Sequence, residues 1–574
     1  MNELSQLARR RGFFFPSNEA YGGVSGFYTY GPQGSAMKQN IEDVWRDRFI
    51  TKQNNMEIDA PTVFPEDVFD ASSHLETFND LLIECQHCQE SHRADHLIED
   101  NTDIDEAEHF SPEEISDIIA EHEISCPTCG EPLIDQQVNE FNLMFKTNIG
   151  PSSHNPGYLR PETAQGIFVE FPRLKEYARG QLPFGVGQIG RAYRNEISPR
   201  NALIRVREFT QAELEMFIDP NSDSPMIEQV GDVRITLYSA LAQERNEGHV
   251  TKSVTQALDE DIIHNEWIAY YLGLAKQWYQ RIGVDMDRFR FRQHQSGELS
   301  HYAVDCWDAE AEVDGDWFEL AGFAYRSDYD LQKHTEHSDE EFTIFKQYDE
   351  PKTVERVSVD PDMSYLGPQF GEKAAAIAEA IQSKAEREPT AFDHDEISVE
   401  VDDETYTIPR DKTGFERQQV TKSGHHITPH IIEPSFGVGR ALYTVFCHAY
   451  ETDEVNGETR NVLRLEPDIA PTFVGVFPLM AKDGLATKAK DIAATLRSAG
   501  FSTTYDTSGA IGRRYRRQDE IGTPYCVTID YETIEEGEYT DTVTLRDRDS
   551  ATQIRVPIDK LVSELNALHT RSAT

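Results

Sequence analysis

The sequence contains no apolar run of the roughly 18 to 20 residues that a membrane-spanning helix needs. Its first residues, MNELSQLARRRGFFFPS, also lack the apolar core and the cleavage site of a secretory signal peptide. Only 7 of the 574 residues are cysteines, which argues against a disulfide framework in a chain of this length. We therefore expect a cytoplasmic protein with no membrane partner, whose length requires two or three domains.

Basic residues are few relative to acidic ones. Asp and Glu number 102 against 54 Lys and Arg, so the formal net charge is −48. Such a charge normally repels a polyanion. The acid is spread along the whole chain, so we favour adaptation to high salt, where screening shortens the reach of repulsion to about 3 Å at 1 M. Acidic disordered tails are the alternative.

The stretch GRAYRNEISPRNALIRVREFTQAELEMF, from Gly190 to Phe217, carries charged residues on two runs that alternate like strands. Arg194 and Glu196 share one face of the first run. The face predicted for the second run consists of Arg205, Arg207, Phe209, Gln211, Glu213 and Glu215. Strands lined by Arg and Glu form sheets poorly unless the face is paired or liganded. An aromatic ring between arginines suits a purine base joined to phosphates; a solvated sheet face is the alternative.

Two glycine-rich segments differ in what they predict. YGGVSGFYTYGPQGSAMKQN lacks the GK[ST] ending of a phosphate-binding P-loop. In EPSFGVGR, from Glu433, Gly437 and Gly439 allow the backbone to approach a ligand closely, and an amphipathic helix is predicted to begin there. Arg440 lies in the first turn of that helix, where the helix dipole disfavours a cation, so we expect an anion nearby. A plain turn into a core helix is the alternative.

Four of the cysteines form two pairs, Cys85 with Cys88 and Cys126 with Cys129, separated by an acidic insert. Thiolates two residues apart fit one tetrahedral ion, and four of them complete a closed structural zinc site. The separation of the two pairs exceeds that of an ordinary zinc ribbon. Reduced free thiols are the alternative to zinc.

Several strings resemble one enzyme family. Arg194-Asn195-Glu196, followed by Arg205-Val206-Arg207-Glu208-Phe209, resembles motif 2 of class II aminoacyl-tRNA synthetases. The segment from Met37 through MEIDAPTVFP resembles motif 1, which builds the homodimer interface in that family, and EPSFGVGR resembles motif 3. The strings RPETAQGIFVEF, from Arg160, and EPSFGVGR are similar to those of glycyl-tRNA synthetases of the archaeal, eukaryotic and dimeric bacterial type. The resemblance covers most of the chain except its acidic insertions.

The resemblance implies an α+β fold, in which helices flank a class II antiparallel sheet and a C-terminal α/β domain binds the anticodon. We expect the catalytic domain over residues 1–465, with insertions at about 81–130 and about 334–422, and the anticodon-binding domain over 466–574. IFVEF is predicted to be a strand. The basic cluster Arg513, Arg514, Arg516 and Arg517 suggests an RNA-binding surface, with arginines paired to nearby acids as the alternative.

The resemblance also implies which residues bind ATP. Arg194 would hold the α-phosphate, Arg205 and Arg440 the β- and γ-phosphates, and Phe209 would stack on adenine. Glu196 and Glu319 would serve ATP or its Mg2+, so that Arg194, Glu196, Arg205 and Arg440 form the catalytic set. The full ATP-binding set comprises Arg194, Asn195, Glu196, Ile204, Arg205, Val206, Arg207, Glu208, Phe209, Glu319, Leu320, Gly437, Val438, Gly439 and Arg440.

The glycine site follows from the same resemblance. Glu162, Glu213 and Glu433 would surround the ammonium group, and Arg326 would lie near the carboxylate unless it forms a surface salt bridge. The full substrate-binding set comprises Arg93, Glu162, Phe209, Thr210, Gln211, Ala212, Glu213, Arg326, Glu433, Pro434, Ser435, Phe436 and Gly437. The implied reaction joins glycine to tRNA(Gly) through glycyl-adenylate. A catalytically silent relative, or a synthetase for another amino acid such as threonine or proline, is the alternative.

Overall fold

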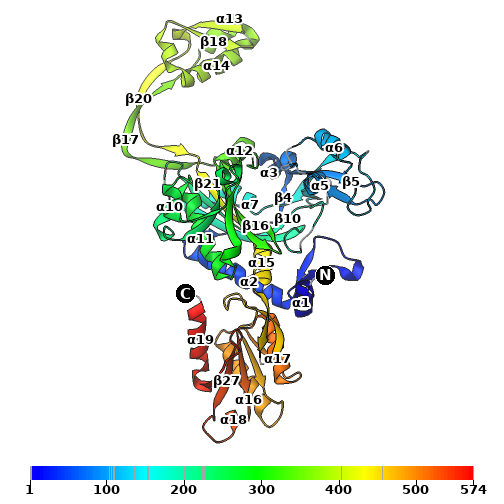
Figure 1. Ribbon diagram of the computed structural model, residues 1–574. Helices are drawn as coiled ribbons and strands as arrows, with labels where there is room; N and C mark the ends of the chain where they lie inside the picture. Colours follow the sequence, from blue (N-terminus) through cyan, green and yellow to red (C-terminus); the bar gives the residue numbers. More distant parts are fainter. Residues whose placement is uncertain are drawn as a thin grey trace. The chain divides into compact units, whose positions relative to one another are not determined.

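The computed structural model describes residues 3–572 except 103, 105, 106, 108, 109, 135, 152, 153, 200, 201, 223, 225, 301, 403 and 456. The chain divides into two compact units (Figure 1). The larger comprises residues 1–342 and 428–574, and the smaller comprises residues 343–427. Among the described residues, no helix combines the length and the apolar character that crossing a membrane requires.

A nine-stranded sheet forms the centre of the larger unit, and its middle strands are antiparallel. This arrangement agrees with the antiparallel sheet expected from the sequence. In spatial order the strands are β13 (Val250–Ser253), β12 (Arg234–Tyr238), β14 (Phe289–Gln293), β15 (Asp305–Val313), β16 (Asp316–Ser327), β21 (His430–Gly437), β11 (Glu208–Ile218), β10 (Phe184–Tyr193) and β3 (Met56–Glu57).

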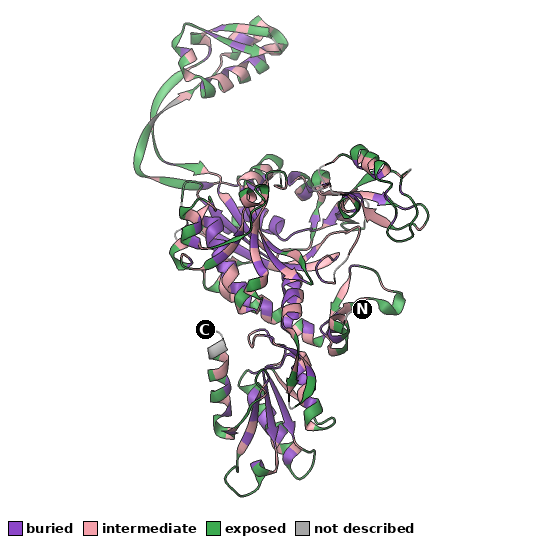
Figure 2. Ribbon diagram, viewed as in Figure 1, coloured by how far each residue is buried: buried purple, intermediate pink, exposed green. Residues whose placement is uncertain are grey.

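The two faces of strand β11 have different surroundings. Ala212, Leu214 and Met216 enter the main apolar core, while the residues between and before them, Gln211, Glu213 and Glu215, are polar. Helices α2 (Pro32–Trp45), α11 (Glu266–Arg281) and α15 (Val438–His448) contribute to this core, which is visible as the purple interior in Figure 2. Burial of each large apolar side chain stabilises the fold by roughly 1.5–3 kcal/mol. The core thereby fixes the direction of the polar face, on which the candidate site lies.

Two expectations about strands are wrong. The segment IFVEF spans the end of helix α7 (Ala164–Phe168), the following turn and the first residue of α8 (Phe171–Tyr177). A short buried apolar run does not distinguish strand from helix. The hairpin is also shorter than predicted, because β10 ends at Tyr193 and β11 begins at Glu208. The four charged residues predicted to lie on its strands therefore fall in the connection, namely Arg194, Glu196, Arg205 and Arg207.

The cysteine-bearing segment has an apolar core of its own. Strands β5 (Asn79–Glu84), β6 (Ser91–Arg93) and β7 (Val138–Asn142) form a small antiparallel sheet, accompanied by α5 (Ala94–Asn101) and α6 (Pro112–Glu121). Ser111 caps α6 in a reciprocal arrangement with Glu114, which satisfies backbone donors at the start of the helix. The segment is thus a folded subdomain.

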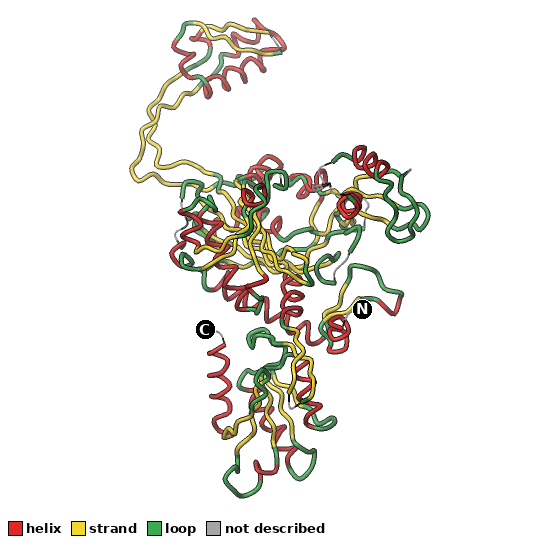
Figure 3. The backbone as a smooth tube through the Cα atoms, viewed as in Figure 1, coloured by secondary structure: helices red, strands yellow, loops and turns green. Residues whose placement is uncertain are grey.

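The smaller unit contains a long two-stranded ribbon, β17 (Ile344–Ser358) with β20 (Glu416–Ile427), visible in Figure 3. It also contains α13 (Met363–Phe370), α14 (Ala374–Arg387) and the hairpin β18 (Glu396–Val401) with β19 (Glu404–Pro409). Its core includes Ile377, Ile381 and Phe392. Residues 343–427 thus form a separately packed body, whereas α12 (Tyr329–His337) belongs to the larger unit.

The C-terminal segment folds around a five-stranded sheet and an apolar core distinct from the main one. Its strand order is β25 (Thr503–Tyr505), β24 (Val474–Pro478), β26 (Tyr525–Ile529), β27 (Thr542–Asp547) and β28 (Gln553–Pro557), and its larger helices are α16 (Leu485–Ser498), α17 (Ile511–Ile521) and α19 (Leu561–Ser572). The first three strands are parallel and the others antiparallel. This is the expected α/β architecture.

Shorter elements complete the chain. They are α1 (Glu3–Arg11), β1 (Phe14–Pro16), β2 (Tyr28–Tyr30), β4 (Val63–Pro65), α3 (Glu66–Ala71), α4 (His74–Thr77), β8 (Phe145–Asn148), β9 (Pro156–Leu159), α9 (Ala240–Glu244), α10 (Val254–Asp259), β22 (Tyr450–Val455), β23 (Glu458–Leu463) and α18 (Tyr531–Ile534).

Candidate active site

A cavity of about 240 Å³ opens on the polar face of the central sheet. Its walls come from the connection between β10 and β11 and from β11, β15, β16, β21 and the start of α15. It brings together most of the residues expected to bind ATP or glycine. These are Glu162, Arg194, Glu196, Ile204, Arg205, Val206, Phe209, Thr210, Gln211, Glu213, Glu319, Leu320, Glu433, Ser435, Gly437, Gly439 and Arg440.

The other expected residues lie elsewhere in the described structure. Ala212, Phe436 and Val438 enter the apolar core on the opposite side of their elements. Arg207 donates to the backbone carbonyls of Glu196 and Ser25. The remaining members of this group are Arg93, Asn195, Glu208, Arg326 and Pro434. Strand alternation explains the inward direction of Ala212 and Phe436, since neighbours along a strand point to opposite faces, whereas Val438 belongs to the first turn of α15.

Arg93 is engaged within the cysteine-bearing subdomain. Its guanidinium forms ion pairs with Asp80, at 3.2 Å, and with Asp95. Both carboxylates and the arginine are largely buried. In this structure, therefore, Arg93 organises its own subdomain.

Arg194, in the connection between β10 and β11, lies beside the aromatic ring of Phe209 on β11. Its guanidinium carbon is 5.4 Å from the centroid of Phe209, and its Nε donates to the carbonyl of Pro161 over 3.2 Å. Arg205 lies 4.0 Å from Glu196. A guanidinium beside an aromatic ring is an arrangement that suits base stacking together with phosphate binding.

Arg440 has the anionic neighbour that its helix position led us to expect. Its Nη1 lies 3.0 Å from a carboxylate oxygen of Glu319, and its Nε donates to the carbonyl of Ile204. The positive charge of Arg440 lowers the pKa of the Glu319 carboxyl. The side chain of Glu319 is half exposed, so this pair remains open to a competing anion.

Three buried carboxyls surround the inner end of the site. Glu213 accepts hydrogen bonds from the backbone N–H of Thr163 at 2.7 Å and from the hydroxyl of Ser435 at 2.6 Å. Glu162 accepts a hydrogen bond from Gln165 over 3.1 Å. Glu433 accepts a hydrogen bond from Arg326 over 2.8 Å. All three carboxyls are at most 8% exposed, so their charges interact strongly.

Arg326 is buried, which excludes the surface salt bridge that the sequence left open. It is 1% exposed and forms two hydrogen bonds with Asp330, at 2.8 and 3.0 Å, besides its bond to Glu433. The ring centroid of Tyr302 lies 3.8 Å from its guanidinium carbon. The arginine supplies fixed positive charge behind the carboxyl cluster.

Glu215 is a member of this cluster that the predicted site set omitted. It is 0% exposed, and neither of its carboxyl oxygens has a hydrogen-bond partner. It lies in one group with Glu213 and Glu433, in which one oxygen from each falls within 4.8 Å of the others. Burial, followed by the neighbouring Glu433, raises the pKa of Glu215 well above its usual value. Its alternation with Glu213 along β11 was the available sequence signal.

The environments divide the carboxyls into two kinds. Burial and the neighbouring carboxylates, against the opposing effect of Arg326, raise the pKa of Glu433 to about 8. Burial opposes ionisation of Glu162 too, but His74 and Arg326 lower its pKa below the usual range. Neighbouring carboxyls that cannot all ionise share protons. The cluster thus combines a carboxyl of lowered pKa, Glu162, with carboxyls of raised pKa, Glu215 and Glu433.

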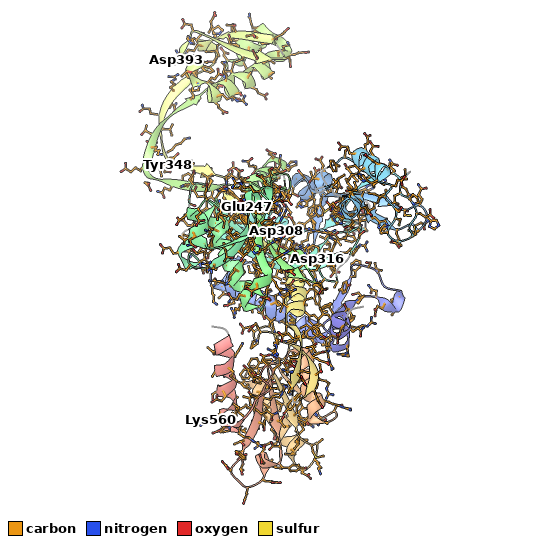
Figure 4. All side chains as sticks on the ribbon, viewed as in Figure 1. Glu247, Asp308, Asp316, Tyr348, Asp393 and Lys560 are labelled. Carbon is orange, nitrogen blue, oxygen red and sulfur yellow. The ribbon has the colours of Figure 1, made fainter. Side chains whose placement is uncertain are left out.

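The cavity also contains residues that the predicted set lacked. They are Tyr30, Leu203, His294, Ser300, Tyr302, Cys306, Asp308, Gly322 and Ala324, of which Asp308 is labelled in Figure 4. Cys306 and Asp308 alternate along β15, which would have placed both on one face. Their proximity to the β11 face depends on the strand order, which no local pattern specifies.

The four paired cysteines converge as predicted for a single metal ion. The Sγ atoms of Cys85 and Cys129 are 3.6 Å apart, and those of Cys88 and Cys126 are 3.7 Å apart. All four Sγ atoms lie within 4.8 Å of one another. This donor set and spacing fit tetrahedral zinc.

The predicted basic surface is only partly exposed. Arg514 is buried and donates to the carbonyls of Pro478 and Gly509, and Arg517 pairs with Asp506. Arg513 is exposed. Helical spacing explains this difference, because residues of α17 that face its sheet cannot also face an external partner.

Comparisons with known proteins agree with this geometry. The model of the class II tRNA synthetase core domain (G, H, P, S and T) matches residues 145–448, and the model of an anticodon binding domain matches residues 474–568. Glycine–tRNA ligase from Methanothrix thermoacetophila is 49% identical over 99% of this chain and 96% of its own length. Those from Methanothermobacter thermautotrophicus and Pyrococcus furiosus are both 44% identical, over 98% of each chain.

A solved structure shares the fold at low sequence identity. Prolyl-tRNA synthetase from Cryptosporidium parvum, complexed with halofuginone and AMPPNP, matches with a TM-score of 0.51 and 11% identity, over 99% of this chain and 75% of that one. The fold and the matched core define a class II aminoacyl-tRNA synthetase. At 44–49% identity over nearly the full length of its relatives, the chain belongs to the archaeal-type glycine–tRNA ligase family.

Proposed function

We propose that this protein joins glycine to tRNA(Gly) in two steps. The glycine carboxylate attacks the α-phosphorus of ATP, giving glycyl-adenylate and pyrophosphate; a terminal ribose hydroxyl of the tRNA then attacks the adenylate carbonyl and releases AMP. One observation carries the proposal in a chain of this family. A single cavity joins a cluster of buried carboxyls to an aromatic ring, Phe209, that lies beside the guanidinium of Arg194, and Arg205 and Arg440 line the same cavity. It thus offers an ammonium site next to a nucleotide site.

Alignment and charge stabilisation supply the catalysis, since neither step needs a side-chain nucleophile. Arg194 would hold the α-phosphate and Phe209 would stack on adenine. Arg205 and Arg440 would hold the β- and γ-phosphates. Because Arg440 already pairs with Glu319, the triphosphate would take over part of this ion pair. Glu319 would therefore compensate the positive charge of Arg440 until ATP binds.

The chain could hold Mg2+ only together with the phosphates of bound ATP. Among the described residues, neither Glu196 nor Glu319 belongs to a group of three metal-ligating side chains. Mg2+ commonly binds one or two carboxylates together with substrate phosphates, and the half-exposed Glu319 suits that role. The ion would neutralise phosphate charge.

Glycine recognition depends on orientation and on exclusion. Glu162, Glu213 and Glu433 would hold the ammonium group, with Ser435 fixed by its hydrogen bond to Glu213. When two substrates differ by one methylene that only fills or leaves empty part of a pocket, their binding free energies differ by about 1–3 kcal/mol. Steric overlap with a β-carbon discriminates more strongly. Because the residues that form the wall of this pocket are buried and hydrogen-bonded to one another, moving them to make room for a β-carbon would cost free energy.

The remaining assignments extend this proposal. The four cysteines would hold one structural Zn2+, and the C-terminal domain would contact the tRNA anticodon. By resemblance to the family, the active species is a homodimer with motif 1 at its interface. The substrate tRNA implies a cytoplasmic location. The net charge of −48 suits function in concentrated salt.

Pyrophosphate exchange dependent on each amino acid tests the proposed activity. We expect exchange with glycine alone, and its loss in Arg194→Ala. The control, Arg513→Ala, alters an exposed arginine of α17 and should retain exchange. Exchange with threonine or proline instead would identify another synthetase. Failure with every amino acid, in both low and molar KCl, would favour a catalytically silent relative.

A further inference from the structure

Three potential metal ligands from two neighbouring strands meet on the ATP side of the cavity. His294 directly follows β14, and its backbone N–H donates to the carbonyl of Cys306 over 2.9 Å. Cys306 and Asp308 are two residues apart on β15 and so point to the same face. The Nε2 of His294 lies 2.9 Å from Oδ2 of Asp308. One ligand atom from each residue falls within 4.8 Å of the other two.

This donor set is suited to a transition metal rather than to Mg2+. A thiolate, an imidazole and a carboxylate are all established zinc ligands, whereas Mg2+ prefers oxygen. Ligands at 2.0–2.1 Å in a tetrahedron are about 3.3 Å apart, so His294 and Asp308 need only a small adjustment. With the thiol deprotonated, the three ligands carry two negative charges, which match the charge of Zn2+.

A separate observation indicates that the imidazole has an unfilled role. The Nδ1 atom of His294 is buried and has no hydrogen-bond partner in the described structure. Because no hydrogen bond holds Nδ1, the ring can turn to place either nitrogen toward an ion shared with Cys306 and Asp308. Opposite Asp308 on β16 stands Gly322, where an added Cβ would lie 3.7 Å from Oδ1 of Asp308. The absence of a larger side chain there keeps the cluster accessible from the cavity.

We propose that His294, Cys306 and Asp308 form a zinc site inside the active-site cavity, separate from the four-cysteine site. Three protein ligands leave a fourth tetrahedral position, and all three residues line the cavity. That position therefore faces the space assigned to ATP, beside Glu319 and Arg440. A bound zinc ion inhibits the enzyme by competing with Mg–ATP, a consequence that rests on the proposed function; the binding itself does not.

Metal stoichiometry tests the binding directly. The full-length protein is incubated with ZnCl2, desalted and analysed for zinc. We expect two ions per chain in the wild type and one in Cys306→Ala, with Asp308→Asn as a second variant in case the first melts abnormally. Cys447→Ala is the matched control, since Cys447 lies in α15 and outside the cavity lining, and it should keep two. One ion in the wild type, or two in both site variants, overturns the proposal.

Cobalt identifies the ligands of the second ion. After one equivalent of zinc has filled the four-cysteine site, added CoCl2 should produce a weak thiolate-to-cobalt absorption band from a single cysteine. The band should be absent in Cys306→Ala and present in Cys447→Ala; a band of equal strength in both contradicts the assignment. Zinc should also raise the KM for ATP at least several-fold in glycine-dependent exchange. If exchange fails altogether, the proposed function fails while the cobalt result still decides the site.

Discussion

The guanidinium of Arg326 donates to a carboxylate oxygen of Glu433 over 2.8 Å, and both groups are withdrawn from solvent. Arg326 also forms two hydrogen bonds to Asp330. One cation thus compensates two buried carboxyls, and it lies 4.0 Å from a third, that of Glu162. This relationship supplies positive charge beside the buried carboxyls that line the cavity.

Removing the positive charge of Arg326 should therefore destabilise the protein and weaken glycine binding. Breaking one side of a buried ion pair costs about 3–5 kcal/mol, because the remaining charges lack compensation. We expect Arg326→Gln to lower the midpoint of thermal unfolding markedly and to raise the KM for glycine more than that for ATP. Arg513→Gln, at an exposed position, should change stability by less than about 0.5 kcal/mol. Equal melting of the two variants would show that the buried pairs contribute little.

Glu215→Gln should become more stable relative to wild type as pH rises. A carboxyl whose pKa is raised by folding binds its proton more tightly in the folded state. Its stabilising contribution is complete below the unfolded pKa of about 4.3 and is lost as pH rises toward the folded pKa. The neutral amide of glutamine does not titrate. Thermal melts from about pH 5 to pH 8 should show the difference growing in favour of the variant.

Glu213→Gln provides the contrast on the same strand face. Glu213 accepts hydrogen bonds from Thr163 and Ser435, so its amide variant places a donor against existing donors. A mismatch of this kind costs about 1–3 kcal/mol. A pH-independent difference between Glu215→Gln and wild type would refute the protonated state of Glu215.

Unusual charge and strand alternation are enough to predict which residues of β11 share one face and line one cavity. Phe209, Gln211 and Glu213 could be placed on one face because a strand repeats every two residues. The resemblance to class II synthetases then adds candidate site residues from segments that are distant in the sequence, such as the one that begins at Glu433. Both sources identify residue types and faces, which depend on local geometry.

Features that depend on tertiary pairing were not predicted. IFVEF was assigned to a strand because a buried apolar run of that length lacks a decisive period, and packing selected the helix α7. His294 and Asp308 meet only because β14 pairs with β15 in a particular register. The burial of Arg514 likewise depends on which side of α17 packs on its sheet. Sequence patterns indicate which residues share one face of a helix or strand. Which residues of different elements lie next to one another depends on how the strands and helices pack in the folded protein.

Loss of one zinc ligand should unfold the cysteine-bearing subdomain locally. Structural zinc contributes folding free energy directly, and this subdomain has a small core of its own. We expect Cys129→Ser to lose the tightly held zinc ion and to exchange amide hydrogens faster over residues 79–142. Cys447→Ser should retain both the ion and the protection of this segment. If amide protection in Cys129→Ser is unchanged, the proposal that the four thiols hold a structural zinc ion is wrong.

The stability of the protein should rise with the concentration of KCl. At a net charge of −48, repulsion among carboxylates favours the expanded state, and salt reduces this repulsion by screening. The screening length falls from about 10 Å at 0.1 M to about 3 Å at 1 M, so most of the gain should occur within that interval. Thermal melts at neutral pH across this range would measure the gain. Near pH 4.5 many carboxyls are protonated, so the same increase in salt should then raise the melting temperature less. A melting temperature that is independent of KCl at neutral pH would instead mean that neighbouring cations already compensate the acidic surface.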